Sequence, residues 1–543
     1  MNTLLQKKGI IVLYLSGLVF PAKAQIPFNV VDSLDVNNIK TWQLVHGDMW
    51  YDPSTNSPRC EYPKGSGKHI GFSGALWFAG YDNNSFLSVA AQTYRTDGVD
   101  YWPGPLENST IIDYTESEKW ARIWKLNRWE LESFLNTSVH TTANTPATIL
   151  EWPAKGNTYA KGYNGASLTL LNRQYAPFVD ANSDGIYNSL DGDYPAMKGD
   201  QMTWFIYNDN SLFHTVSNGI PLMLEVSCMA YAYKRNSTID NVIFYEYSIT
   251  SRNPFPIDSF VIGTFADVDL GYGFDDYCGY DSTRNLGIVY NGDPLDGTGT
   301  GSGEYHDSIP KAGITVLQFP GDTCGNVSSA GSFLFFNNGN SVPNYDSQFN
   351  HLLRARWIDG AHLKDYPNNN DINYLFPDDP SIPGGWSECA GGYPPNDVRM
   401  VLSSKPFQLA SGATFNYAFA LVASPQALNN SCPGTTFADI RIVSDTAQKV
   451  FCNPLPVVSA VEDILPGKLS LYPNPATNTL HIACHPDDVC LVKVLDITGQ
   501  DIHINTTTSD KGITIDVTHL ANGVYQLLLT SKATVQSARF VKQ

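Results

Sequence analysis

The sequence predicts a mainly β protein, with a β-sandwich-type ectodomain that contains few short helices and a small C-terminal β-sandwich. Three observations predict this fold class. Apolar and polar residues alternate with a period of two in several segments, as in half-buried strands. Aromatic residues, which favour strands, make up 12% of the chain. The 43 glycines and 33 prolines supply turns between the strands.

Residues 1–24 have the pattern of a secretory signal peptide. Lys7 and Lys8 precede an apolar run over 9–20, and Pro-Ala-Lys-Ala at 21–24 ends in small residues. The apolar run is shorter than the roughly 20 residues that span a membrane. No other stretch is apolar enough to do so, and we therefore expect an exported chain without a transmembrane span.

The ectodomain is expected over residues 25–452, as one or two β-rich domains. A strand is predicted at 74–80. Two hairpins are predicted further on. One joins 241–250 to 259–265, and the other joins 398–402 to 415–422 through a Ser-Gly turn.

Only two helices are predicted, and a linker follows the second. Asn127 and Glu130 have the spacing of a capping box, which predicts a short helix to about Leu135. A second helix is predicted at 437–451. The proline-containing stretch 453–467 then predicts a linker.

Residues 468–543 contain short alternating strands separated by turns, which predicts a small antiparallel sandwich. Four segments resemble the type A sorting domain of the type IX secretion system of Bacteroidetes. They are Tyr-Pro-Asn-Pro-Ala at 472–476, Asp-Ile-Thr-Gly at 496–499, Leu-Ala-Asn-Gly-Val-Tyr at 520–525 and Phe-Val-Lys at 540–542.

This resemblance implies a partner and a location. The domain would engage the type IX secretion machinery, so that the chain passes through the periplasm and is released or attached to the outer cell surface. Cleavage of the domain would accompany that step. The segments 178–200 and 267–293 also resemble uncharacterised surface proteins of the same class, which implies no known reaction.

Charge and cysteine content narrow the partners further. The chain has a formal net charge of −19, so it repels phosphate backbones, and we expect no nucleic acid. An acidic surface does attract divalent cations. The nine cysteines match no zinc pattern, and disulfides are allowed in an exported chain. Cys484 and Cys490 flank a turn and are candidates for one bridge.

The strongest chemical motif is the loop at 180–191, which has calcium-loop spacing. The predicted ligands are Asp180, Asn182, Asp184, the carbonyl of Ile186 and Asp191. Calcium prefers six to eight hard oxygens, and glycine at the sixth position permits the sharp bend. We expect the ion to be structural. The alternative is an Asx-rich turn without a metal.

A second candidate metal site is a group of five carboxylates, Asp267, Asp269, Asp275, Asp276 and Asp281. They follow an apolar strand, and their mutual repulsion requires an explanation. Either a bound cation or exposure to solvent would provide one, and both remain open at this point.

The expected function is binding, adhesion or surface structure by an exported calcium-stabilised protein, with a glycan or protein ligand. Nucleophile-elbow, zinc-protease, phosphate-loop and dinucleotide motifs are missing from the sequence, which favours a protein that is not an enzyme. The alternative is a secreted hydrolase of unrecognised type that acts on polysaccharide or protein. The aromatic pairs at 50–51, 77–78 and 101–102 are candidates for stacking on sugars, although such pairs more often pack in a core.

Overall fold

The structure is a computed structural model. It describes residues 29–107, 114–170, 172–210, 213–339, 341–365, 368–428, 430–456, 470–483, 489–496, 501–509, 512–531 and 535–543. The predicted signal peptide, most of the predicted linker and Cys484 lie outside these residues. The chain divides into two compact units, Met1–Val457 and Val458–Gln543.

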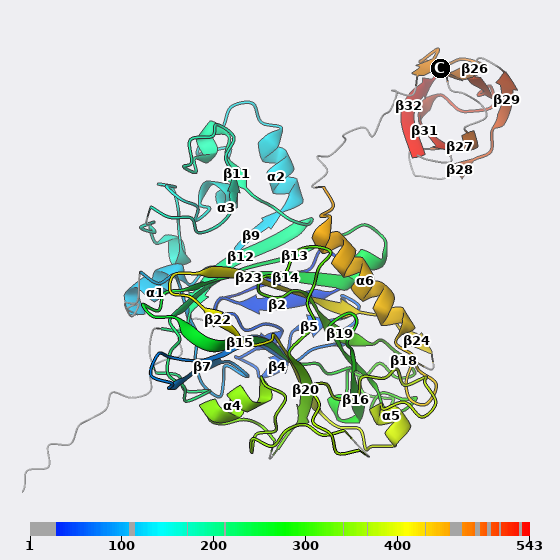
Figure 1. The fold of residues 1–543 in the computed structure, drawn as a ribbon. Coiled ribbons are helices and arrows are strands. Elements are labelled where there is room, and N and C mark those ends of the chain that lie inside the picture. The colour runs from blue at the N-terminus through cyan, green and yellow to red at the C-terminus, as the bar shows by residue number, and fades with distance from the viewer. Residues whose placement is uncertain are drawn as a thin grey trace, which may run out of the picture. The chain divides into compact units, whose positions relative to one another are not determined.

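The larger unit is built on two antiparallel sheets (Figure 1). The first has nine strands in the order β16-β17-β19-β23-β14-β13-β12-β8, with β9 also paired to β12. Its strands are β8 (Trp102–Pro103), β9 (Trp124–Asn127), β12 (Gln201–Asn208), β13 (Leu224–Ala232), β14 (Val242–Ser251), β16 (Asp276–Asp281), β17 (Leu286–Asn291), β19 (Ala312–Gln318) and β23 (Thr414–Ala423).

The second sheet has six strands in the order β20-β21-β15-β6-β7, with β22 also paired to β15. Its strands are β6 (Ser73–Tyr81), β7 (Leu87–Ala91), β15 (Ile257–Asp267), β20 (Ser332–Asn337), β21 (Val398–Ser403) and β22 (Phe407–Leu409). The predicted mainly β, sandwich-type fold is therefore confirmed.

Both predicted hairpins are wrong, although all four strands exist. β14 pairs with β13 and β23 in the nine-stranded sheet, whereas β15 pairs with β6, β21 and β22 in the other sheet. β21 and β23 are likewise in different sheets. Each connection crosses from one sheet to the other, because both strands of each predicted hairpin have an apolar face that is buried between the two sheets.

The main core lies between the inward faces of the two sheets. Ile243, Tyr245 and Ile249 of β14 are fully buried there, and so are Phe260 and Ile262 of β15. A hydrogen bond of 2.7 Å joins the hydroxyls of Thr264 and Tyr417 across the core. The candidate sugar-stacking pairs at 50–51, 77–78 and 101–102 are buried, so these aromatic side chains pack rather than present a surface.

A second core covers part of the outer face of the nine-stranded sheet. It contains Trp124, Trp152 and Trp204 together with apolar residues of α6 such as Ile440 and Val443. Figure 1 shows α6 lying against this sheet. The helices are α1 (Tyr114–Trp120), α2 (Arg128–Leu135), α3 (Ala147–Leu150), α4 (Asp346–Leu352), α5 (Glu388–Gly391) and α6 (Ala438–Cys452).

Both predicted helices are present, as α2 and α6. Asn127 and Glu130 form the predicted capping box at the start of α2. Disulfides join Cys324 to Cys452 at the end of α6, and Cys389 in α5 to Cys432. The thiols of Cys60, Cys228 and Cys278 are free and buried.

Short strands and single helical turns complete the larger unit. The strands are β1 (Val31–Leu34), β2 (Lys40–Leu44), β3 (Tyr51–Asp52), β4 (Ser57–Pro58), β5 (Cys60–Glu61), β10 (Phe178–Val179), β11 (Tyr194–Pro195), β18 (Ser308–Ile309) and β24 (Ala427–Leu428). The 3-10 turns are η1 (Tyr163–Gly165), η2 (Ser189–Asp191), η3 (Thr238–Asn241) and η4 (Gly273–Asp275).

The smaller unit consists of two four-stranded antiparallel sheets, β25-β26-β30-β29 and β28-β27-β31-β32, around a core that includes Leu480, Ile515 and Phe540. The predicted small C-terminal β-sandwich is confirmed. Its strands are β25 (Ser470–Tyr472), β26 (Thr479–Ala483), β27 (Val489–Leu495), β28 (Asp501–Ile502), β29 (Asn505–Ser509), β30 (Gly512–Asp516), β31 (Gly523–Ser531) and β32 (Val535–Lys542).

Candidate functional site

The predicted calcium loop, 180–191, connects the short strands β10 and β11 near its two ends. Asp180 accepts hydrogen bonds from the amides of Asp184 (3.2 Å) and Gly185 (2.7 Å). Asp184 accepts one from the amide of Ile186 at 2.8 Å. The bond from Ile186 to Asp184 is that of an Asx turn, and the two bonds to Asp180 close a wider turn around it, so that the loop is tightly bent. The calcium ligand set there remains a prediction.

The far end of this loop is arranged by a residue that the spacing did not single out. Asp191 lies in η2 and accepts from the side chain of Asn188 at 2.6 Å. The fully buried carboxylate is that of Asp193, which accepts from the amides of Ala181 (2.8 Å) and Asn188 (2.9 Å) and so closes the loop. The position of Asp193 directly before β11 was the one sequence signal that could have indicated this role.

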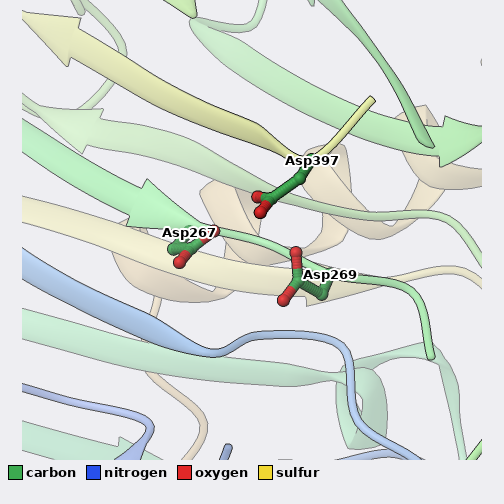
Figure 2. A group of neighbouring side chains, drawn as sticks. All are labelled: Asp267, Asp269 and Asp397. Carbon is green, nitrogen blue, oxygen red and sulfur yellow. The ribbon is translucent and has the colours of Figure 1, made fainter. Parts of the chain in front are cut away.

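Asp267 and Asp269 of the second candidate site lie beside a third carboxylate, that of Asp397. Asp267 ends β15, and the antiparallel pairing of β15 with β21 sets it opposite Arg399. Asp397 directly precedes β21 and therefore lies at the same end of the two paired strands. One carboxylate oxygen from each aspartate lies within 4.8 Å of one from each of the others (Figure 2). We call this group the aspartate triad.

One cation faces the triad. Arg399 contacts Asp397 at 2.8 Å and Asp267 at 3.6 Å. The hydroxyl of Tyr94 donates to Oδ2 of Asp267 and accepts from Nε of Arg399 at 2.6 Å. Oδ1 of Asp267 and Oδ1 of Asp269 are buried and have no hydrogen-bond partner among the described residues.

Burial sets the electrostatics of the triad. It raises the pKa of Asp267 to about 6 and the pKa of Asp269 well above its usual range, and neighbouring carboxylates raise the pKa of Asp269 further. Two like charges 4.8 Å apart repel by about 3–4 kcal/mol at an effective dielectric constant near 20. The triad therefore requires neutralisation in the folded state.

The other three predicted ligands of this site lie outside the triad. Asp276 is fully buried and accepts from the amide of Leu270 at 3.0 Å. Asp275 accepts from the amide of Gly297 at 2.6 Å, and burial raises its pKa to about 7. The carboxylates of Asp275 and Asp269 add to the effect of burial in raising the pKa of Asp276, but neither Asp275 nor Asp276 converges with the triad.

Asp281 has a separate structural role at the opposite end of β16. It contacts Arg441 at 2.6 Å and Arg284 at 3.2 Å. Burial raises its pKa, but hydrogen bonds from Thr283 and Arg441 outweigh burial and hold it below the usual range. Solvent exposure, one of the two explanations for the acidic segment, is excluded for Asp267, Asp275, Asp276 and Asp281, because all four are buried.

A groove of about 650 Å³ lies over the part of the nine-stranded sheet that the second core leaves open. Its floor is polar because the outward face of the strands changes character along their length. In β14 the outward residues run from the buried Phe244 to Glu246, Ser248 and Thr250. Ser227, Thr414 and Asn416 on the neighbouring strands extend this floor.

Two clusters of charged residues, each centred on a glutamate, flank the floor of the groove. Glu225 accepts from Arg173 at 2.7 Å and from Arg252 at 2.6 Å. Glu246 accepts from Lys198 at 2.6 Å and from the hydroxyl of Tyr231 at 2.6 Å. Both carboxylates are thus held in fixed positions by cations.

The spacing of these two carboxylates is wide. Glu225 pairs with Thr250 and Met229 pairs with Glu246, so the two glutamates are four positions apart along neighbouring strands. Four positions correspond to about 14 Å between their backbones. Glycoside hydrolases place their two carboxyl groups about 5–9.5 Å apart. The backbones of this pair are therefore further apart than the two carboxyl groups of a glycosidase.

Residues 470–543 match the family model of the secretion system C-terminal sorting domain. The chain thus ends in the sorting domain of type IX secretion, and the protein is secreted or attached to the outer cell surface. The predicted export route and location are confirmed by this match. None of the helices in the described part of the chain is long and apolar enough to cross a membrane.

Two solved structures have a distant similarity to the chain. One is a polysaccharide lyase, at 8% identity and a TM-score of 0.18, over 59% of this chain and 34% of that one. Another is a provisionally assigned aldose 1-epimerase from Escherichia coli K12, at 9% identity and a TM-score of 0.22, over 73% of this chain and 99% of that one. The chain spans about a third of the lyase, and at these TM-scores neither likeness establishes a common fold. No curated protein matches the sequence.

Proposed function

We propose that this exported protein is a calcium-stabilised β protein that binds an oligosaccharide in the groove of the nine-stranded sheet. The observation that supports the binding function is the polar floor of the groove. Its volume, about 650 Å³, falls within the range of small-ligand sites. The spacing of the loop at 180–191 supports calcium as a structural ion.

The chemistry of the floor favours a sugar. Ser248, Thr250 and Asn416 offer short hydroxyl and amide groups that both donate and accept, as sugar hydroxyls do. A peptide that adds a strand needs a free sheet edge, whereas the groove lies on a sheet face.

The competing function is a secreted hydrolase. A hydrolase would require a carboxylate free to transfer protons, but Glu225 and Glu246 are each held by a cation and lie far apart. Binding without turnover fits this arrangement better.

The proposal is tested by blocking the floor of the groove. Ser248→Leu adds bulk at the centre, and we expect it to weaken oligosaccharide binding at least about tenfold, or about 1.4 kcal/mol. The matched control is Ser133→Leu on the exposed face of α2, which should leave binding unchanged. Glycan arrays identify the ligand, and calorimetry with the mature protein measures the affinity.

Three results would overturn the proposal. The first is a wild type that binds no oligosaccharide on the array. The second is a Ser248→Leu variant that binds as tightly as Ser133→Leu. Hydrolysis of a bound glycan, abolished by Glu246→Gln, would establish the hydrolase instead.

A further inference from the structure

We propose that the aspartate triad, Asp267, Asp269 and Asp397, is a second calcium site that joins β15 to β21. It is separate from the loop at 180–191 and does not depend on the oligosaccharide groove. It deepens the proposed calcium stabilisation by placing a cation in the core of the larger unit.

The distances within the triad fit a single calcium ion. Calcium binds oxygens at about 2.3–2.6 Å, so two of its ligands are at most about 5 Å apart. One oxygen from each aspartate meets this limit, since the three are mutually within 4.8 Å. Figure 2 shows the carboxylates of Asp267, Asp269 and Asp397 converging from two segments of the chain.

The charges of the triad also call for a divalent cation. Three carboxylates face one guanidinium, that of Arg399, so a charge of about −2 remains when all three are ionised. Buried charges in proteins are paired or coordinate metals. A calcium ion would neutralise the remainder.

Two buried oxygen atoms provide independent support for a ligand. Oδ1 of Asp267 belongs to a side chain that is only 2% exposed, and it has no hydrogen-bond partner among the described residues. Oδ1 of Asp269 is also buried without a partner in the described part of the chain. Such atoms are rare in folded proteins, because leaving them unpaired costs the full desolvation penalty.

Protonation alone does not explain these atoms. A neutral Asp269 would carry no charge, but its Oδ1 would still lack a partner among the described residues. A cation at the centre of the triad contacts Oδ1 of both aspartates at once and removes both deficits.

The surroundings hold the triad in place for binding. Tyr94 and Arg399 fix Asp267 from the side opposite its free oxygen. Gly273 leaves room for Asp269, because a Cβ there would lie 2.4 Å from Oδ1 of Asp269. Asp269 itself is half-buried, which gives an ion a route from solvent.

The donor set selects calcium over other metals. Carboxylate oxygens are hard ligands, and the triad contains no histidine or cysteine. Magnesium requires nearly ideal octahedral geometry and keeps several waters, whereas calcium accepts irregular, partly buried oxygen sites.

The test compares the melting temperatures of wild type and Asp269→Asn, both as the full mature protein, in chelator and in calcium. We expect their order to reverse between the two conditions. In chelator, the variant should melt higher than wild type, because the wild-type Asp269 must then either keep a buried repulsive charge or take up a proton, and both cost stability. In millimolar calcium, the wild type should melt higher, because only it gains the ion at this site. Calorimetric titration of calcium into the variant should show one fewer bound ion.

Matched variants separate this site from the loop. Asp184→Asn should lose only the ion at 180–191. Adding Asp269→Asn to this variant should still reverse the order of melting temperatures between chelator and calcium. Tyr94→Phe removes the hydroxyl that positions Asp267 and should weaken calcium binding at the triad about 10–100-fold. If Asp269→Asn fails to fold, Tyr94→Phe gives the decisive titration.

The outcomes are distinguishable. Equal calcium-induced shifts in wild type and Asp269→Asn would overturn the triad site. Loss of an ion in Asp184→Asn with none lost in Asp269→Asn would leave the loop as the calcium site and also overturn this inference. Tighter binding of magnesium than of calcium would contradict the choice of ion. None of these results bears on oligosaccharide binding.

Discussion

The loop at 180–191 and the aspartate triad both gather acidic side chains, but they treat them in opposite ways. In the loop, Asp180 and Asp184 accept hydrogen bonds from backbone amides of the same turn. In the triad, Oδ1 of Asp267 and of Asp269 are buried without such donors among the described residues.

The difference shows what a spacing pattern can and cannot reveal. A loop satisfies its carboxylates locally, so its sequence alone contains the pattern. The triad is assembled by the pairing of β15 with β21, which brings Asp397 to Asp267 and Asp269 from a distant part of the chain. Carboxylates brought together by the tertiary structure have no local amides to rely on, which makes a cation the more necessary partner.

The largest effect should come from removing Arg399, the one cation among the described residues that faces the triad. Arg399→Met leaves Asp267 and Asp397 without their guanidinium, and we expect a loss of about 3–5 kcal/mol in the free energy of unfolding. Asp184→Asn in the loop should cost at most about 1 kcal/mol. Urea denaturation in chelator measures both.

Two further measurements complete that comparison. Arg399→Lys keeps a positive charge and should recover part of the loss. Similar costs for Arg399→Met and Asp184→Asn would mean that burial does not separate the two regions.

A buried carboxyl without carboxylate neighbours sharpens the comparison. Burial raises the pKa of Glu388 to about 8, and its carboxyl accepts from the amide of Cys278 at 2.5 Å. The folded state therefore keeps this proton up to about pH 8, whereas the unfolded chain releases it near pH 4.5, the ordinary pKa of a glutamate.

The sign of the pH effect follows from that difference. The contribution of the Glu388 proton to the free energy of unfolding is full below about pH 4.5. It is lost as the pH rises toward 8, by about 1.4 kcal/mol per pH unit. Urea denaturation across this range should show the decline, and Glu388→Gln should flatten it. A slope that persists unchanged in Glu388→Gln would assign the effect to other groups.

The smallest expected effect compares two glycines, one in each region. Gly273→Ala places a Cβ against Asp269 and should cost about 1–3 kcal/mol while also reducing the calcium-induced rise in melting temperature. Gly185 in the loop has a φ of +77° and open space around it. Asparagine tolerates that conformation, so Gly185→Asn should cost less than about 1 kcal/mol. Thermal melts with and without calcium decide whether only Gly273→Ala affects the triad.

Local patterns in the sequence were sufficient to predict individual elements but not their pairing. Asn127 and Glu130 predicted the start of α2 because a capping box involves only neighbouring residues. The strands at 241–250 and 259–265 were also predicted, and they are present as β14 and β15. Their separation into two sheets was not, because a short connection allows a hairpin or a crossover equally well.

The same limit applies to the candidate site. Asp267 and Asp269 were predicted as metal ligands because they lie close together in the sequence. Asp397 was missed, since only the register of β15 against β21 brings it to them. Asp281 was grouped with them from its position in the sequence, whereas in the structure it lies at the end of β16 and contacts Arg441.

The disulfide at the end of α6 has a mechanical consequence when the larger unit is pulled from its C-terminal side. Cys452 is the last residue of α6, and its partner Cys324 lies 128 residues earlier. Tension that enters the larger unit from its C-terminal end meets this covalent bond first. The helix then cannot be peeled from that end while the bond is intact. Resistance to pulling therefore depends on the redox state of the surroundings.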